Sequence, residues 1–223
     1  MGDINRNAVE YINGEGDKIN DFQSNYQEFN EFFAQLQPLE SATLSDQKKM
    51  AKIEQYITTY VKEVKEHVFK IYKPEEELWA IQRVDDLENN QGAQLEQLLD
   101  ILKEQEFNEA LKNTNITDAV NDDLPGVRYY LELIDEAGDM LASLSSYVAG
   151  ETDQKTAFLA NADDFMNYYK LLEPLEQKPS EIRDLSIILR LYNDITDTAN
   201  TVFSRYKPID KVNATMTVEA LEK

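Results

Sequence analysis

FQSNYQEFNEFFAQLQPLE, residues 22–40, occurs a second time as FLANADDFMNYYKLLEPLE, residues 158–176. A shift of 136 residues aligns the two stretches without a gap. The identical pairs are Phe22/Phe158, Asn25/Asn161, Phe29/Phe165, Leu36/Leu172, Pro38/Pro174, Leu39/Leu175 and Glu40/Glu176. The chain therefore contains an internal repeat, and the repeat decides how the rest of the sequence is interpreted.

Two further blocks repeat on either side of this stretch. YINGEGD (11–17) aligns with YVAGETD (147–153) at the same shift, and VFKIYKP (68–74) aligns with VFSRYKP (202–208) at a shift of 134. Three blocks in one order, with one two-residue change in length, define two copies of the repeat, residues 17–74 and 153–208.

The first half of each copy has the pattern of an amphipathic helix. Its apolar residues recur at alternating steps of four and three, which places them on one stripe of a helix; in the first copy these are Phe22, Tyr26, Phe29, Phe33 and Leu36. Gly14 and Gly150 are expected to cap the preceding helix, because glycine adopts the left-handed conformation without steric cost. Pro38 and Pro174 are expected to end the repeated helix.

The second half of each copy repeats the same spacing from Ile53 to Tyr72 and from Ile187 to Tyr206. Each copy is therefore predicted to be an antiparallel helical hairpin with an apolar, aromatic-rich inner face. The predicted fold class is all-α, with one or more elongated helical bundles built from the duplicated hairpin.

The remaining segments connect the copies. Residues 75–112 are predicted to form one long or two shorter helices with a break near Asn89–Gly92, residues 113–124 a loop, and residues 125–149 a helix opened by Pro125. This predicts a first unit over 1–124 and a second over 125–223, or one continuous pseudo-symmetric bundle. Residues 1–13 correspond to the end of the 125–149 helix, and 209–223 to the start of the 75–90 helix. We therefore expect an excised piece of a longer array; the alternative is a complete pseudo-twofold protein.

Composition limits the partners. The 223 residues carry a net charge of −21, with 43 acidic and 22 basic side chains, and a chain without a concentrated basic patch is poorly suited to bind nucleic acid or anionic lipid. No apolar run approaches the 18 residues of a membrane span, so no membrane insertion is expected. The absence of cysteine and the fragment-like ends favour an extracytoplasmic or cell-surface location over the cytoplasmic alternative.

No residue pattern in the sequence predicts catalysis, a cofactor or a metal. His67 is the single histidine, so it cannot supply a two-histidine zinc site, and it is expected to be an ordinary helix-surface residue. The acidic runs at Asp122-Asp123, Asp163-Asp164 and Glu75–Glu77 lack the spacing of a calcium loop. The last of these follows Pro74, where negative charge stabilises the first turn of a helix.

The sequence therefore predicts a non-enzymatic helical-repeat module for scaffolding, spacing or protein binding at a bacterial cell envelope. Its partner is expected to be another protein or further copies of the same repeat. Residues outside the predicted seams that suit an interaction surface are Trp79, Tyr56, Tyr60 and Tyr129. The alternative is a binder of a small or apolar ligand in an aromatic-lined pocket of the bundle.

Overall fold

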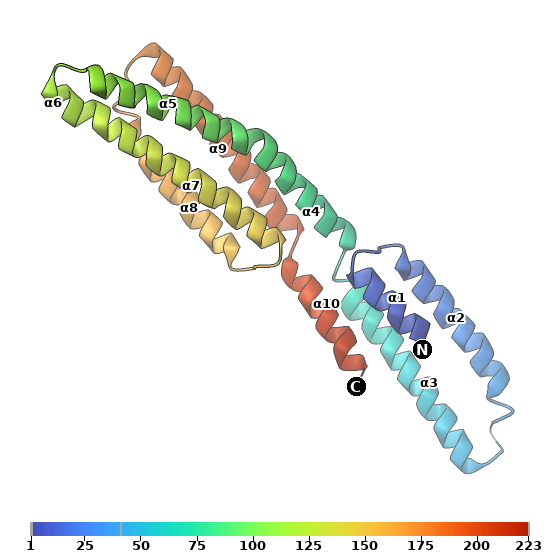
Figure 1. Ribbon diagram of the computed structural model, residues 1–223. Coiled ribbons are helices and arrows are strands. Elements are labelled where there is room, and N and C mark those ends of the chain that lie inside the picture. The colour runs from blue at the N-terminus through green and yellow to red at the C-terminus, as the bar shows by residue number, and fades with distance from the viewer. Residues whose placement is uncertain (1, 41, 223) are drawn as a thin grey trace. The chain divides into compact units, whose positions relative to one another are not determined.

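The computed structural model describes residues 2–40 and 42–222, and within them the regular structure is helical, without strands (Figure 1). The predicted all-α class is confirmed. In chain order the elements are α1 (Gly2–Ile12), α2 (Lys18–Leu36), α3 (Leu44–Val64), the π-helical segment η1 (Lys65–Phe69), α4 (Pro74–Leu87), η2 (Glu88–Gly92), α5 (Ala93–Lys112), α6 (Ile116–Asp118), η3 (Ala119–Asp123), α7 (Leu124–Val148), α8 (Gln154–Leu172), α9 (Pro179–Arg205) and α10 (Pro208–Leu221).

The helices pack as two compact units that differ from the predicted ones. Unit 1 is Met1–Leu78 with Lys207–Lys223, and unit 2 is Trp79–Tyr206. The boundary expected between 124 and 125 lies inside unit 2, because α5 and α7 pack against each other. Most of α4 belongs to unit 2, whereas α10, its counterpart in the second copy, belongs to unit 1. The helix that follows each copy of the repeat therefore belongs, wholly or for the most part, to the unit of the other copy.

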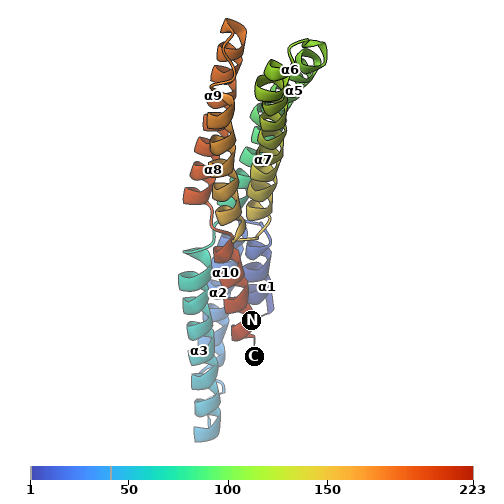
Figure 2. The same cartoon turned by 90° about the vertical axis from the view of Figure 1, so that its left-hand side faces the viewer.

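Unit 2 consists mainly of α5, α7, α8 and α9. Helix α8 runs back along most of α7, and α5 covers α7 from another side (Figures 1 and 2). The interior contains large buried side chains from α7, α8 and α9, among them Tyr130, Leu144, Phe158, Phe165, Leu172 and Ile188. Dense packing of these aromatic and aliphatic groups supplies the main stabilising free energy of the unit.

Unit 1 consists of α1, α2, α3 with η1, and α10. Helix α1 packs against α2 and α10, and α10 also contacts α3 and η1. The buried side chains lie where all four helices are present, and include Ile4, Phe22, Ile57, Val64, Val68 and Tyr72.

Equivalent residues of the two copies make equivalent contacts. The Tyr11 hydroxyl donates to the Tyr72 carbonyl at 3.0 Å, and the Tyr147 hydroxyl donates to the Tyr206 carbonyl at 3.0 Å. Edge-to-face aromatic contacts accompany both: the ring centroids are 4.8 Å apart in Tyr11–Phe69 and in Tyr147–Phe203. These contacts join the helix before each copy to the end of its second helix. Superposition of the complete hairpins stays a prediction.

The two predicted glycine caps are present. Gly14 and Gly150 have φ of 109° and 124°, a region that residues with a Cβ rarely adopt. The amide of each glycine donates to the carbonyl of the tyrosine three residues earlier, at 3.1 Å in both copies. The sharp reversal into α2 and α8 therefore depends on the glycine in each copy.

Removing the buried tyrosine hydroxyl is expected to weaken both units similarly. Tyr147→Phe keeps the ring but deletes its hydrogen bond to the Tyr206 carbonyl, so we expect a loss of about 1 kcal/mol in the free energy of unfolding. Tyr11→Phe is the matched change in unit 1 and should cost a similar amount. Urea unfolding of the two variants measures this, and a cost confined to one of them would show that the two hydrogen bonds are not equivalent.

Of the two connecting segments, the first has one of its two predicted forms and the second differs from its prediction. Residues 75–112 form one long helical stretch, because α4 continues into α5 through the π-helical segment η2 at the place of the expected break. The loop expected at 113–124 contains the short α6 and η3. Asn115 begins this segment by accepting a hydrogen bond from the Thr117 amide at 3.1 Å, as an N-cap residue does.

Candidate functional site

Two of the four predicted surface residues are partly buried in unit 2. Trp79 packs against the core, and the Arg205 guanidinium lies over its ring, 4.1 Å from the centroid. Tyr129 likewise packs against the same core from α7. Both side chains therefore act in packing, although part of each still faces solvent.

The other two lie on α3 in unit 1 and have opposite environments. Tyr56 is 51% exposed, and its hydroxyl donates to the Leu221 carbonyl at 2.7 Å. Tyr60 is only 2% exposed, and its hydroxyl donates to Asn5 Oδ1 at 2.6 Å. The expectation that Tyr60 faces solvent is wrong, because it lies three residues after Ile57 and four before Val64 and so shares their buried face.

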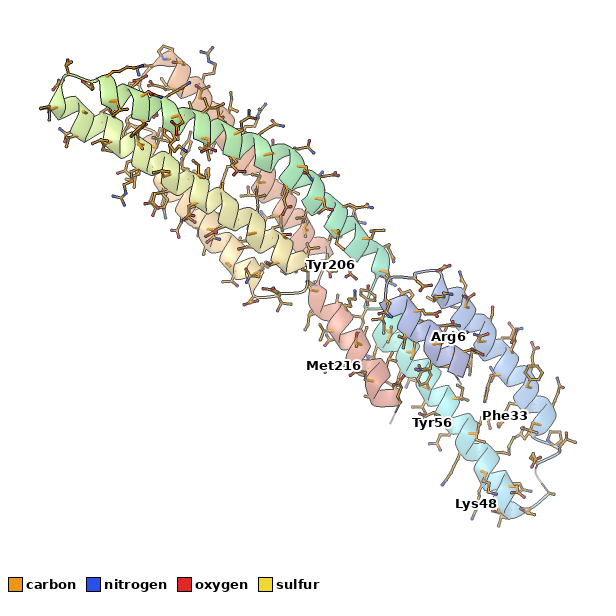
Figure 3. The ribbon with its side chains drawn as sticks, in the orientation of Figure 1. Arg6, Phe33, Lys48, Tyr56, Tyr206 and Met216 are labelled. Atoms are coloured by element: carbon orange, nitrogen blue, oxygen red, sulfur yellow. The ribbon has the colours of Figure 1, made fainter. Side chains whose placement is uncertain are left out.

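The largest apolar exposure of unit 1 is at the end where α2 and α3 are joined, which we call the open end (Figure 3). Its residues lie on the last half of α2, the following turn and the first half of α3. The exposed members are Phe32, Leu36, Leu39, Leu44, Ile53 and Tyr56, and Tyr26, Phe29 and Phe33 are partly buried. Phe32 is 68% and Leu39 76% exposed. A concentration of exposed large apolar side chains on neighbouring elements is typical of a binding surface.

The second copy buries the same positions. Leu36 is 45% exposed, whereas Leu172, its identical counterpart, is fully buried. Three further pairs show the same difference in exposure, with the residue of the second copy buried and that of the first copy more exposed: Phe29/Phe165, Phe33/Tyr169 and Glu40/Glu176. By contrast, Phe22 and Phe158 near the start of the repeated helix are both buried. The two copies therefore differ at one end only.

The cause of this difference is the length of the neighbouring helices. Gly2 and Asp3, at the start of α1, correspond to Gly138 and Asp139 in the middle of α7. The half of α7 before Gly138 has no counterpart among the described helices of unit 1, and neither has α5. Figure 1 shows α2 and α3 continuing beyond the ends of α1 and α10.

A second candidate is a carboxylate pocket at one end of unit 2, where α5, η3 and the α8–α9 connection meet. Its volume is 140 Å³, and its lining includes Glu106, Glu109, Asp123, Lys178 and Glu181. Oxygens of the three glutamates lie within 4.8 Å of one another. Lys178 Nζ is 2.6 Å from both Glu109 and Glu181 and therefore forms an ion pair with two of the three glutamates.

Two carboxyl groups at this end of unit 2, Glu106 in the pocket and the neighbouring Glu176, have a raised pKa. Burial and then the neighbouring Glu176, Glu109 and Glu181 raise the pKa of Glu106 to about 8. Burial raises the pKa of Glu176 to about 7, although a hydrogen bond donated by the Tyr130 hydroxyl opposes the rise. These groups are therefore partly protonated near neutral pH, and fewer negative charges meet in the pocket.

Sequence reasoning missed this group of carboxyls. Glu106 and Glu109 are spaced three apart and share a helix face, which is the one local signal. Glu181 joins them from α9, more than 70 residues away in the sequence. Asp123, one of the acidic pair noted in the sequence, is buried beside them, and its Oδ2 accepts a hydrogen bond from Asn113 at 2.8 Å.

His67 lies where the sequence predicted, on a helix surface. It is 3.3 Å from Glu63 on the same helical stretch and is more than half exposed. It lines a shallow hollow in unit 1 with Ile71, Asn213, Met216, Thr217 and Ala220. No phenylalanine, tyrosine or tryptophan lines this hollow, the carboxylate pocket or a third hollow formed by α5 and α9.

No protein-family model matches the chain, and neither a curated protein nor a solved structure does. Among the residues that the structure describes, no helix combines the length and the apolar character needed to cross a membrane.

Proposed function

We propose that the chain is a non-enzymatic helical-repeat module that binds another protein through the open end of unit 1. One observation carries this proposal: the last part of the apolar stripe is buried in α8, whereas in α2 Phe29 and Phe33 are only partly buried and Leu36 is exposed. Together with the exposed side chains of Phe32 and Leu39, these residues have a strong hydrophobic drive to dock. An amphipathic helix is the natural ligand for such a face.

The repeat itself favours scaffolding and spacing over catalysis. Repeated helical units multiply binding surfaces and set the distances between them. A chain without cysteine suits an environment in which the redox state changes. Its net negative charge disfavours close contact with anionic surfaces. We therefore place the module at a bacterial cell envelope, as a scaffolding or protein-binding element.

Selection of displayed helical peptides against the full chain tests the binding role. We expect enriched peptides with apolar residues at helical spacing, and hydrogen exchange should show that they protect the amides of residues 26–56. Leu36→Ser with Leu39→Ser should weaken their binding at least tenfold, because both side chains are exposed and available for contact.

The matched control is a polar change at another exposed apolar position of the chain, Ile101→Ser on α5 in unit 2. It should leave binding unchanged. Peptides that protect other segments, or that bind the Leu36/Leu39 double variant as well as the parent chain, would contradict the proposal.

A further inference from the structure

We infer that the open end of unit 1 is a docking surface for the helix pair of another copy of this repeat, equivalent to residues 93–137. This inference rests on the proposed function and names the partner for the same surface. Within unit 2 the equivalent face is covered by α5 and by the first half of α7. The chain therefore contains an example of the occupant that its own exposed face fits.

Helix α1 matches the second half of α7 residue by residue in burial. Ile4 and Met140 are both buried, and so are Ala8 and Leu144, and Tyr11 and Tyr147. A helix leading into α1 in the register of α7 would thus continue along α2 as α7 continues along α8. Residues Tyr130 and Leu133 on that half of α7 are almost fully buried.

One polar contact in unit 2 points to the same occupant. The Tyr130 hydroxyl, on the part of α7 before Gly138, donates to Glu176. Glu40, which corresponds to Glu176, is exposed. A glutamate at position 40 is therefore already suited to receive the tyrosine of a docking helix. A second contact of unit 2, from the Tyr168 hydroxyl to Glu132, has no equivalent at the open end, because Phe32 stands in the place of Tyr168.

Helix α5 completes the occupant. It packs on α7 and contacts α9, whose counterpart in the first copy is α3. In unit 2 it buries Leu95, Leu99 and Leu102. The exposed side chains of α3 that such a helix would cover include Ile53. The expected occupant is therefore a pair of helices with apolar faces, one equivalent to α5 and one equivalent to the first half of α7.

A graft tests the inference in the full chain. A second copy of residues 93–137 is joined directly to residue 2, so that the added half of α7 continues into α1 in the register of the native α7. We expect at least tenfold slower hydrogen exchange for residues 26–56. Leu36→Ala should raise the unfolding equilibrium constant in both proteins, and the factor by which it does so should be at least tenfold larger in the graft than in the parent chain.

Two matched controls separate specific docking from the addition of any helix. Two alanines inserted between residues 137 and 2 keep the helix but rotate the added stripe by about 200°. Tyr130→Ser with Leu133→Ser in the added copy alone keeps the register but removes its two large contacts. Both controls should leave residues 26–56 exchanging as in the parent chain.

The outcomes separate this inference from the proposed function. Unchanged exchange in the graft, or equal protection by the controls, would overturn the inference. If the selected peptides still bound residues 26–56 of that graft, the proposed binding function would stand with a different partner. Protection in the graft together with displacement of the selected peptides supports both.

Discussion

Leu172→Ala is expected to lower the free energy of unfolding of unit 2 by about 3 kcal/mol, whereas Leu36→Ala should cost unit 1 less than about 1 kcal/mol. The two leucines hold the same place in the repeat, and each stands two residues before the proline that follows its helix. Leu172 is fully buried and Leu36 is 45% exposed. Truncation therefore leaves a cavity at one position and removes little packing at the other.

Trp79 allows the two units to be followed separately. It is the single tryptophan and packs in unit 2 beneath Arg205. Its fluorescence during urea unfolding should report unit 2, while far-ultraviolet circular dichroism reports both units. Leu172→Ala should move the fluorescence transition to clearly lower urea, and Leu36→Ala should leave it in place. Equal costs for the two substitutions would mean that the open end is covered in the protein as tested.

Unit 2 is expected to lose stability as the pH rises from about 5 to about 8.5. Glu106 and Glu176 have a raised pKa in the folded protein, about 8 and about 7, against an ordinary value of 4.5. The folded state therefore holds protons that the unfolded state has released, and this contribution is fully present only below the ordinary pKa. This contribution is lost as the pH rises through the folded pKa values, so the free energy of unfolding at pH 8.5 should be lower than at pH 5 by several kcal/mol.

Glu106→Gln should flatten this pH dependence. Glutamine has the shape of the protonated carboxyl group and carries no charge, so the variant should gain about 1–2 kcal/mol at pH 8.5 and change little at pH 5. Glu40→Gln is the control, because Glu40 occupies the position of Glu176 in the repeat but is exposed. Thermal unfolding at a series of pH values measures all three proteins. Parallel profiles for the parent chain and Glu106→Gln would exclude the carboxylate pocket as the origin.

Local sequence signals predicted local structure well. Gly14 and Gly150 have the left-handed conformation expected of helix caps, because that conformation depends on a single residue and its immediate neighbours. The predicted stripe is buried throughout in α8, whereas in α2 only Phe22 of the predicted stripe is buried. The segment 113–124 was predicted as a loop because its asparagines and aspartates favour turns; two of them instead begin and support short helical turns.

The sequence could not predict which helix packs against each apolar stripe. Periodicity identifies the apolar face of α2 and of α8 equally, yet only α8 has a neighbour along its whole length. The exchange of α4 and α10 between the units depends on contacts far apart in the chain. The same holds for the carboxylate pocket, where Glu181 meets Glu106 only in the folded protein.

The packing of α1 against α10 in unit 1 determines how the protein responds to a load applied at residues 2 and 221. Helices α1 and α10 pack against each other, and Asn5 near the start of α1 donates a hydrogen bond to Glu222, just after α10, at 2.6 Å. A load applied at residues 2 and 221 therefore separates these two neighbours from one end, one contact at a time. Unit 1 should yield at low force, and unit 2, whose entry and exit points are both internal, is stretched only afterwards.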